Sequence, residues 1–205
     1  ENLKEQKVIA NITVHQVHFM QNLELIKKLQ EEKLIYGIGV SVSAPTEELI
    51  KALKPVPNTV CHVINGIWNE KTAEMMADRN LKVLILGYKE LRRGNDYIAA
   101  HDDIVAGNKK WLYDNLEKLI KRFKLISFDN LAIEQLNVKR LLSDEEWEEF
   151  YQGDDGTSTF YIDAINQKFA QSSTALFEKR YDIGNLTMDE MFKIITDEYR
   201  KEKKI

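Results

Sequence analysis

The chain has 205 residues, of which 43% are hydrophobic and 30% charged, a composition typical of globular proteins. Its net charge of −4 excludes the basic footprint of a nucleic-acid-binding protein. No apolar run reaches the about 18 residues that a transmembrane helix needs, and no secretory signal is recognisable. Cys61 is the single cysteine, which excludes an internal disulfide and a zinc ribbon. We therefore expect a cytoplasmic protein that binds neither membranes nor nucleic acid.

The first part of the chain alternates between predicted strands and helices. Strand patterns occupy residues 7–16, 34–43, 59–64 and 81–86. Helix patterns occupy residues 21–33, 46–53 and 69–79. The first two strands alternate apolar and polar residues, whereas the last is nearly continuously apolar, as in a strand covered on both faces. Strands and helices at this spacing predict βα units and a parallel sheet.

The pattern changes after residue 88. Residues 89–103 predict a loop, residues 108–124 a long helix and residues 125–128 one more short strand. Capping boxes, in which a Ser or Thr is followed three residues later by Glu, predict helices that start at Ser143 and Thr187. Between them, residues 157–163 and 168–172 predict a hairpin. We expect a single domain over residues 1–205, with the βα units in 7–130 and a C-terminal α+β extension, 131–205, packed on them.

Polar residues gather at the carboxyl ends of the predicted strands. Ligands of parallel sheets bind at these ends, whether the sheet is open or closed into a barrel. Glycine and serine also share one side of the strand at 34–43, where small side chains would let a ligand approach the backbone. The candidate site residues are His15, Gln16, Ser41, Ser43, Asn65, Gly66, Gly87, Tyr88 and Lys89, and Asp129 follows the short strand at 125–128.

Several functions are compatible with these strand ends. If His15, His62 and Asp129 converge, they would form the site of a metal-dependent hydrolase or isomerase. Otherwise these three residues would be satisfied polar residues inside a barrel. A further hypothesis is a non-catalytic binding or assembly module that keeps the barrel scaffold. Arg92 and Arg93 either hold a phosphate or carboxylate or lie in a solvated loop. The sequence contains no P-loop, no G-x-S-x-G and no G-x-G-x-x-G motif.

Five stretches of the chain, in this order, resemble the later part of radical S-adenosylmethionine (SAM) proteins, in particular a phage and Firmicute group. They are LIYGIGVSVSAP, TVCHVINGIWNE, LKVLILGYKELRRG, LISFDNLAIEQLNVKRLLSDEEW and YQGDDGTSTFYIDAINQKFAQSST. The resemblance implies an α/β fold, with half of a partial (β/α) barrel followed by an α+β extension. It implies that Ser41 and Ser43 contact the ribose and methionine of SAM, and that Leu86-Gly87-Tyr88 meets the adenine through its backbone.

The family's G-x-I-x-G-x-x-E pattern is matched in part by the strand at 59–64 and the turn after it. Ile64 and Gly66 fit the pattern, His62 stands at the first Gly, and Asn69 stands at the Glu, one residue before Glu70. The resemblance therefore implies that two groups of residues form the site. Ser41, Ser43, Ile64, Asn65, Gly66, Gly87 and Tyr88 would bind the cofactor. His15, His62, Lys89 and Asp129 would bind a small-molecule or peptide substrate.

Two defining motifs of the family are missing. The C-x3-C-x2-C cluster motif and the Gly-Gly-Glu motif do not occur in the chain. We expect the chain to be the C-terminal portion of a longer enzyme that uses SAM and a [4Fe–4S] cluster, and alternatively a descendant that has lost the chemistry. One cysteine cannot replace three thiolate ligands, so the chain alone should be inactive.

The first predicted strand would also lie at an open edge of the sheet. Its unpaired backbone groups could pair with another chain, and we expect a homodimer or swapped assembly.

Overall fold

The computed structural model describes residues 2–91 and 93–203. The chain divides into two compact units, Glu1–Leu141 and Leu142–Ile205. The boundary therefore lies beyond residue 130, where the sequence pattern placed the start of the extension. The expectation that the two parts form one domain, with the second packed on the first, stays a prediction. Among the described helices, none is long and apolar enough to cross a membrane.

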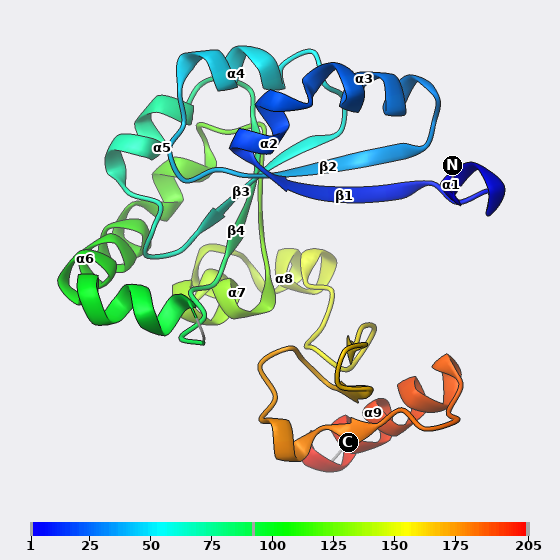
Figure 1. Ribbon diagram of the computed structural model, residues 1–205. Coiled ribbons are helices and arrows are strands. Elements are labelled where there is room, and N and C mark those ends of the chain that lie inside the picture. The colour runs from blue at the N-terminus through cyan, green and yellow to red at the C-terminus, as the bar shows by residue number, and fades with distance from the viewer. Residues whose placement is uncertain (1, 92, 204–205) are drawn as a thin grey trace. The chain divides into compact units, whose positions relative to one another are not determined.

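A five-stranded parallel sheet is the centre of the first unit (Figure 1). Its strands follow one another in sequence order, each paired in parallel with the next. They are β1 (Ala10–His15), β2 (Ile35–Ser41), β3 (Thr59–Ile64), β4 (Lys82–Leu86) and β5 (Leu125–Phe128). The predicted α/β class and parallel sheet are confirmed.

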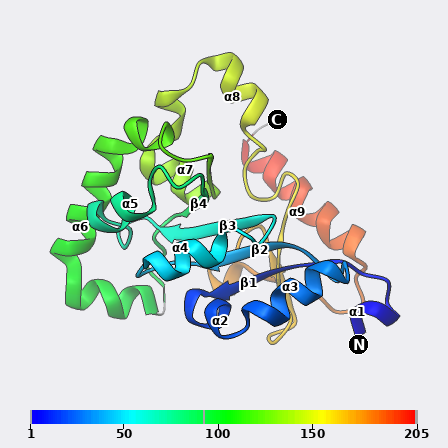
Figure 2. The ribbon, with the colours of Figure 1, turned by 90° about the horizontal axis from the view of Figure 1, so that it is seen from above.

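Apart from the short helix that precedes β1, the helices of the first unit lie against one face of this sheet (Figure 2). Right-handed crossovers that step in one direction place every helix on the same face. The helices are α1 (Asn2–Glu5), α2 (Gln16–Gln21), α3 (Leu23–Glu31), α4 (Glu47–Leu53), α5 (Glu70–Met76), α6 (Arg93–Ile120), α7 (Asn130–Leu136) and the 3-10 turn η1 (Val138–Leu141). Within the first unit the helices cover one face only, and we call the other face of the sheet its uncovered face.

The core of the first unit is built from alternate strand residues. Val40, Cys61, Val63 and Ile85 are almost fully buried and belong to one cluster with apolar residues of α2 to α7. The residues between them in sequence face the other way and are mostly half-buried or exposed. This alternation explains why the strands could be recognised from their period of two.

One prediction about the first unit is wrong, and two helices were not predicted. Residues 93–103 do not form a loop but the first part of α6, whose backbone is kinked at His101 (φ −143°, ψ 31°). The rings of Tyr97 and of His101, one helical turn later, are stacked with their centroids 4.3 Å apart. This contact between residues four apart stabilises the helix in a segment whose polar composition predicted a loop. The helix predicted over residues 21–33 is present as α3, whereas α2 before it and α7 are helices that were not expected. Arg93 begins α6 and is exposed, while Arg92 lies outside the described residues.

The second unit combines helices with a small antiparallel sheet. The sheet has the order β6 (Tyr161–Asp163), β7 (Lys168–Ala170), β8 (Tyr181–Asp182), so the predicted hairpin is confirmed in shorter form and β8 is an addition. The helices are α8 (Asp144–Phe150), α9 (Met188–Lys203) and the 3-10 turn η2 (Phe177–Lys179). Both predicted capping boxes are present. Phe169, Met191 and Ile195 are the buried core.

Candidate functional site

A row of side chains crosses the uncovered face of the sheet at its carboxyl end. The strand register pairs His15 with Ser41, Ser41 with His62, His62 with Leu84, and Leu84 with Ser127. We call His15, Ser41, His62 and Ser127 the polar row. Its four residues come from four different strands, and His15 and Ser41, which are 26 residues apart in sequence, each end their strand. The row is the strongest candidate site in the first unit.

The glycines of β2 make room for side chains of the neighbouring strands. The amide of Gly37 donates a 2.8 Å hydrogen bond to Asn11 Oδ1. A Cβ at Gly39 would lie 2.4 Å from His62 Cε1 and 2.8 Å from Thr13 Oγ1. The His62 ring therefore lies across the β2 backbone. We expected a ligand to approach the backbone here, but at Gly39 the protein's own side chains take this space.

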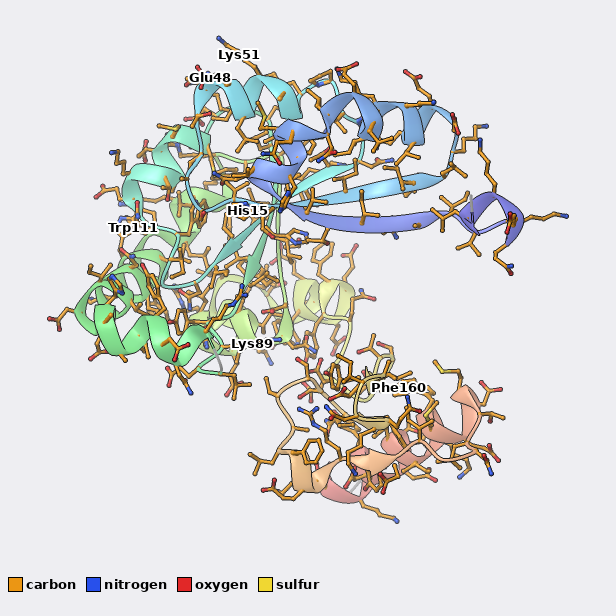
Figure 3. The ribbon with its side chains drawn as sticks, viewed as in Figure 1. His15, Glu48, Lys51, Lys89, Trp111 and Phe160 are labelled. Carbon is orange, nitrogen blue, oxygen red and sulfur yellow. The ribbon has the colours of Figure 1, made fainter. Side chains whose placement is uncertain are left out.

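His62 is the most distinctive ionisable group of the polar row. Its ring is half-buried, and burial lowers its pKa below the ordinary histidine value. Among the described residues, no hydrogen bond or ion pair engages this ring, so it is available as a neutral donor or acceptor. His15 differs, because it is exposed and its Nδ1 accepts a 3.3 Å hydrogen bond from the Val17 amide, which makes it the N-cap of α2. Figure 3 shows His15 at this junction of β1 and α2.

The end of β2 is fixed by one side chain from α2. Gln16 Oε1 accepts hydrogen bonds from the amides of Ser43 (2.9 Å) and Ala44 (3.1 Å), and its Nε2 donates to the Ala44 carbonyl (2.9 Å). Ser41 is half-buried within the polar row, whereas Ser43 is exposed and lies past the paired part of β2. The structure thus places Ser41, but not Ser43, in the row.

The residues that end β3 separate into an exposed one and two buried ones. Ile64 is 41% exposed on the uncovered face, whereas Asn65 is 1% exposed. Asn65 Nδ2 donates a 3.0 Å hydrogen bond to Gln135 Oε1. Gly66 has φ +90°, and a Cβ there would lie 2.9 Å from Val105 Cγ1 of α6. Asn65 and Gly66 therefore serve packing beneath α6 and α7 and leave Ile64 to face a ligand.

The segment after β4 is held from α7. Asp129 Oδ1 accepts hydrogen bonds from the amides of Gly87 (2.9 Å) and Ala132 (2.8 Å), so this carboxylate is the N-cap of α7. Gln135 bonds both backbone groups of Tyr88, accepting from its amide and donating to its carbonyl, each at 2.9 Å. Tyr88 is buried, and Lys89 after it is exposed. Sequence reasoning missed Gln135, although Asp129 before an apolar helical repeat was a recognisable N-cap signal.

A metal site at the strand ends is not found. Within residues 2–91 and 93–203, no three His, Cys, Asp or Glu side chains are placed to hold a metal ion, so the alternative of a metal site formed by His15, His62 and Asp129 has no support there. Cys61 is buried on the helix-covered face, and burial raises its pKa to about 12. A thiol in this state is not an iron ligand. The residues of this chain therefore do not fit a [4Fe–4S] cluster.

Comparison of the chain with protein-family models, with curated proteins and with solved structures finds no match. The resemblance to radical SAM proteins accordingly stays a prediction from the sequence, and any assignment of function must be argued from the polar row and its surroundings.

Proposed function

We propose that this chain is the later part of a radical SAM enzyme and that the polar row lies on its SAM and substrate side. The observation that carries the proposal is the row itself, on the uncovered face of a sheet whose strands follow sequence order. Strands in this order with helices on one side would form a segment of a partial (β/α) barrel. In such folds the carboxyl ends of the strands carry the site.

The residues of the uncovered face divide between cofactor and substrate. Ser41 and Ile64 would contact SAM, with the backbone at the end of β4 next to the adenine. His62, neutral because of its partial burial, would donate or accept a hydrogen bond with a small-molecule or peptide substrate. Asn65, Gly66, Gly87, Tyr88 and Asp129 would support these positions through packing and backbone hydrogen bonds, as their contacts indicate.

The iron–sulfur cluster would have to be held outside this chain. When bound, a [4Fe–4S] cluster supplies the electron that cleaves SAM in such enzymes. The chain's own contribution is limited to binding SAM and orienting the substrate at the polar row.

The test begins with the reading frame that encodes this chain. We expect it to encode a C-x3-C-x2-C motif before Glu1, and the protein with this motif to release 5′-deoxyadenosine from SAM under reducing conditions. Ser41→Ala should weaken SAM binding by about tenfold, the value of one charge-assisted or well-placed hydrogen bond. His62→Ala should slow turnover of the substrate more than it weakens SAM binding.

The matched control is His18→Ala, since His18 is an exposed histidine on α2 outside the polar row. It should leave SAM binding and turnover within twofold of the unmodified protein. A reading frame without the cysteine motif would overturn the proposal. So would Ser41→Ala and His62→Ala proteins that are indistinguishable from the His18→Ala control.

The edge of the sheet formed by β1 supports a second proposal, about the oligomeric state. Among the described strands, β1 pairs only with β2, and the exposed Val8 and Ile9 precede it. We propose that this edge pairs with another polypeptide, most simply a second copy of the chain. Light scattering behind size-exclusion chromatography should give the dimer mass, and Thr13→Pro should return the monomer. A monomer at every concentration would contradict the proposal.

A further inference from the structure

A hollow of about 780 Å³ lies at the amino end of the sheet, opposite to the polar row. Its walls come from the residues that precede and begin β3 and β4, together with the residue before β5. The volume is within the about 300–1,000 Å³ that small-molecule sites occupy. We call its basic lining residues the rim; they are Lys54, Arg79, Lys82 and Lys124. We call its buried apolar lining residues the floor; they are Leu53, Val56 and Leu81.

The rim carries an excess of positive charge in a protein whose net charge is −4. Its one carboxylate, Asp78, is already bound by Arg122, with Nε at 3.0 Å and Nη2 at 2.7 Å. Arg79 is paired with Glu47 at 2.6 Å. In the part of the chain that the structure describes, Lys54, Lys82 and Lys124 have no ion pair. Three lysine charges therefore surround one hollow without a counter-charge.

Part of the lining of the hollow is apolar. Leu53, Val56 and Leu81 are buried, each at most 7% exposed, and Cys61 lies beside them with its thiol protonated. A ligand that matches this arrangement has a multiply charged anionic group for the lysines and a flat or apolar body for the floor. Lysine ammonium groups bind phosphate as point charges, without requiring the planar geometry that arginine imposes.

We infer that this hollow binds a phosphorylated small molecule with an apolar body, such as a nucleoside diphosphate. The site is distinct from the polar row, because Thr59 and Lys82 mark the amino ends of β3 and β4, whereas the row lies at the carboxyl ends. The inference does not depend on the proposed function. A ligand here would contact the end of α4, the segment that follows α5 and the starts of β3 and β4, so it would bind the folded chain only.

The experiment uses isothermal titration calorimetry of the whole chain at constant ionic strength, with three probes. Adenosine diphosphate tests the complete ligand, inorganic pyrophosphate tests the charged group alone, and adenosine tests the apolar body alone. We expect adenosine diphosphate to bind most tightly, pyrophosphate more weakly, and adenosine weakest. The double variant Lys82→Gln/Lys124→Gln should weaken adenosine diphosphate binding by about tenfold or more, because each lysine contributes a charge-assisted hydrogen bond.

The matched control is Lys51→Gln. Lys51 lies on α4, one turn before Lys54, points away from the sheet and does not line the hollow (Figure 3). Circular dichroism verifies that all variants remain folded. The inference is overturned if no phosphate probe binds, if Lys51→Gln weakens binding as much as the double variant, or if the double variant binds adenosine diphosphate unchanged. If the lysines only neutralise the carbonyl ends of α4 and α5, the double variant will lose stability without changing affinity, and this result also overturns the inference.

Discussion

Gly87 lies where the end of β4 touches the start of α7, and an added methyl group has no space there. A Cβ at residue 87 would be 2.4 Å from Leu131 Cγ and 2.8 Å from the Ala132 backbone nitrogen. The backbone atom cannot move without displacing α7, and that movement would also break the bond between the Gly87 amide and Asp129. Overpacking costs about 1–3 kcal/mol and a hydrogen bond to a charged group is worth about 1.5–3 kcal/mol. We expect Gly87→Ala to lower the free energy of unfolding by about 3 kcal/mol.

Gly107→Ala is the matched control for this change. Gly107 lies within α6, and nothing is within 4 Å of a Cβ built there. Alanine in an exposed helix position stabilises by about 1 kcal/mol relative to glycine. The same substitution should therefore have opposite signs at the two positions.

Urea denaturation measures both effects, provided that the signal reports the first unit. Trp147 belongs to the second unit, whereas Trp68 and Trp111 belong to the first. In a Trp147→Phe background, tryptophan fluorescence follows the unfolding of the first unit alone. Gly87→Ala should lower the urea midpoint and Gly107→Ala should raise it. If Gly87→Ala is neutral, or if both substitutions stabilise the protein, the contact between β4 and α7 is not as tight as argued.

Three further predictions concern individual side chains. Burial lowers the pKa of His62, so as the pH falls from about 7 to about 5 the unfolded chain binds a proton at this residue before the folded chain does. The free energy of unfolding should therefore decline over this pH range. In His62→Gln, the urea midpoint should depend less on pH over the same range. Cys61 should not react with a thiol reagent until urea unfolds the chain, since burial raises its pKa to about 12; rapid native labelling would contradict this. Gln135→Leu should lower the free energy of unfolding of the first unit by about 2 kcal/mol, because it leaves the backbone amide and carbonyl of Tyr88 unpaired. Glu134 is an exposed neighbour, so Glu134→Ala should leave the urea midpoint unchanged.

The sheet could be predicted because each strand carries its own pattern. Burial on one face forces apolar residues into alternate positions, as Val40, Cys61 and Val63 show, and these positions are readable without knowledge of neighbours. The parallel arrangement follows from the intervening helices. Together, the two patterns predicted that His15 and Ser41 lie at the carboxyl ends of their strands. The register places these two residues opposite each other, and it also pairs Ser41 with His62.

The roles of several candidate residues could not be predicted, because they depend on partners distant in sequence. Asn65 and Gln135 are separated by 70 residues and meet only because α7 returns to the ends of β3 and β4. Asp129 looked like a site carboxylate, yet its oxygen is used by two backbone amides. Gly39 looked like an opening for a ligand, yet its role depends on the His62 ring across the strand pair. Polar residues at strand ends are equally suited to catalysis and to fixing the backbone.

The one-sided, sequence-ordered sheet has a consequence for how such a unit can change in size. Each added strand and helix occupies the next place along one edge, and no existing connection has to cross or be rethreaded. Either β1 or β5 could therefore accept another βα step while the interior pairings of β2, β3 and β4 stay as they are. Growth or loss of whole steps at the margins would leave the register that aligns His15, Ser41 and His62 intact, so the unit is suited to being lengthened by duplication or joined to a neighbouring segment during evolution.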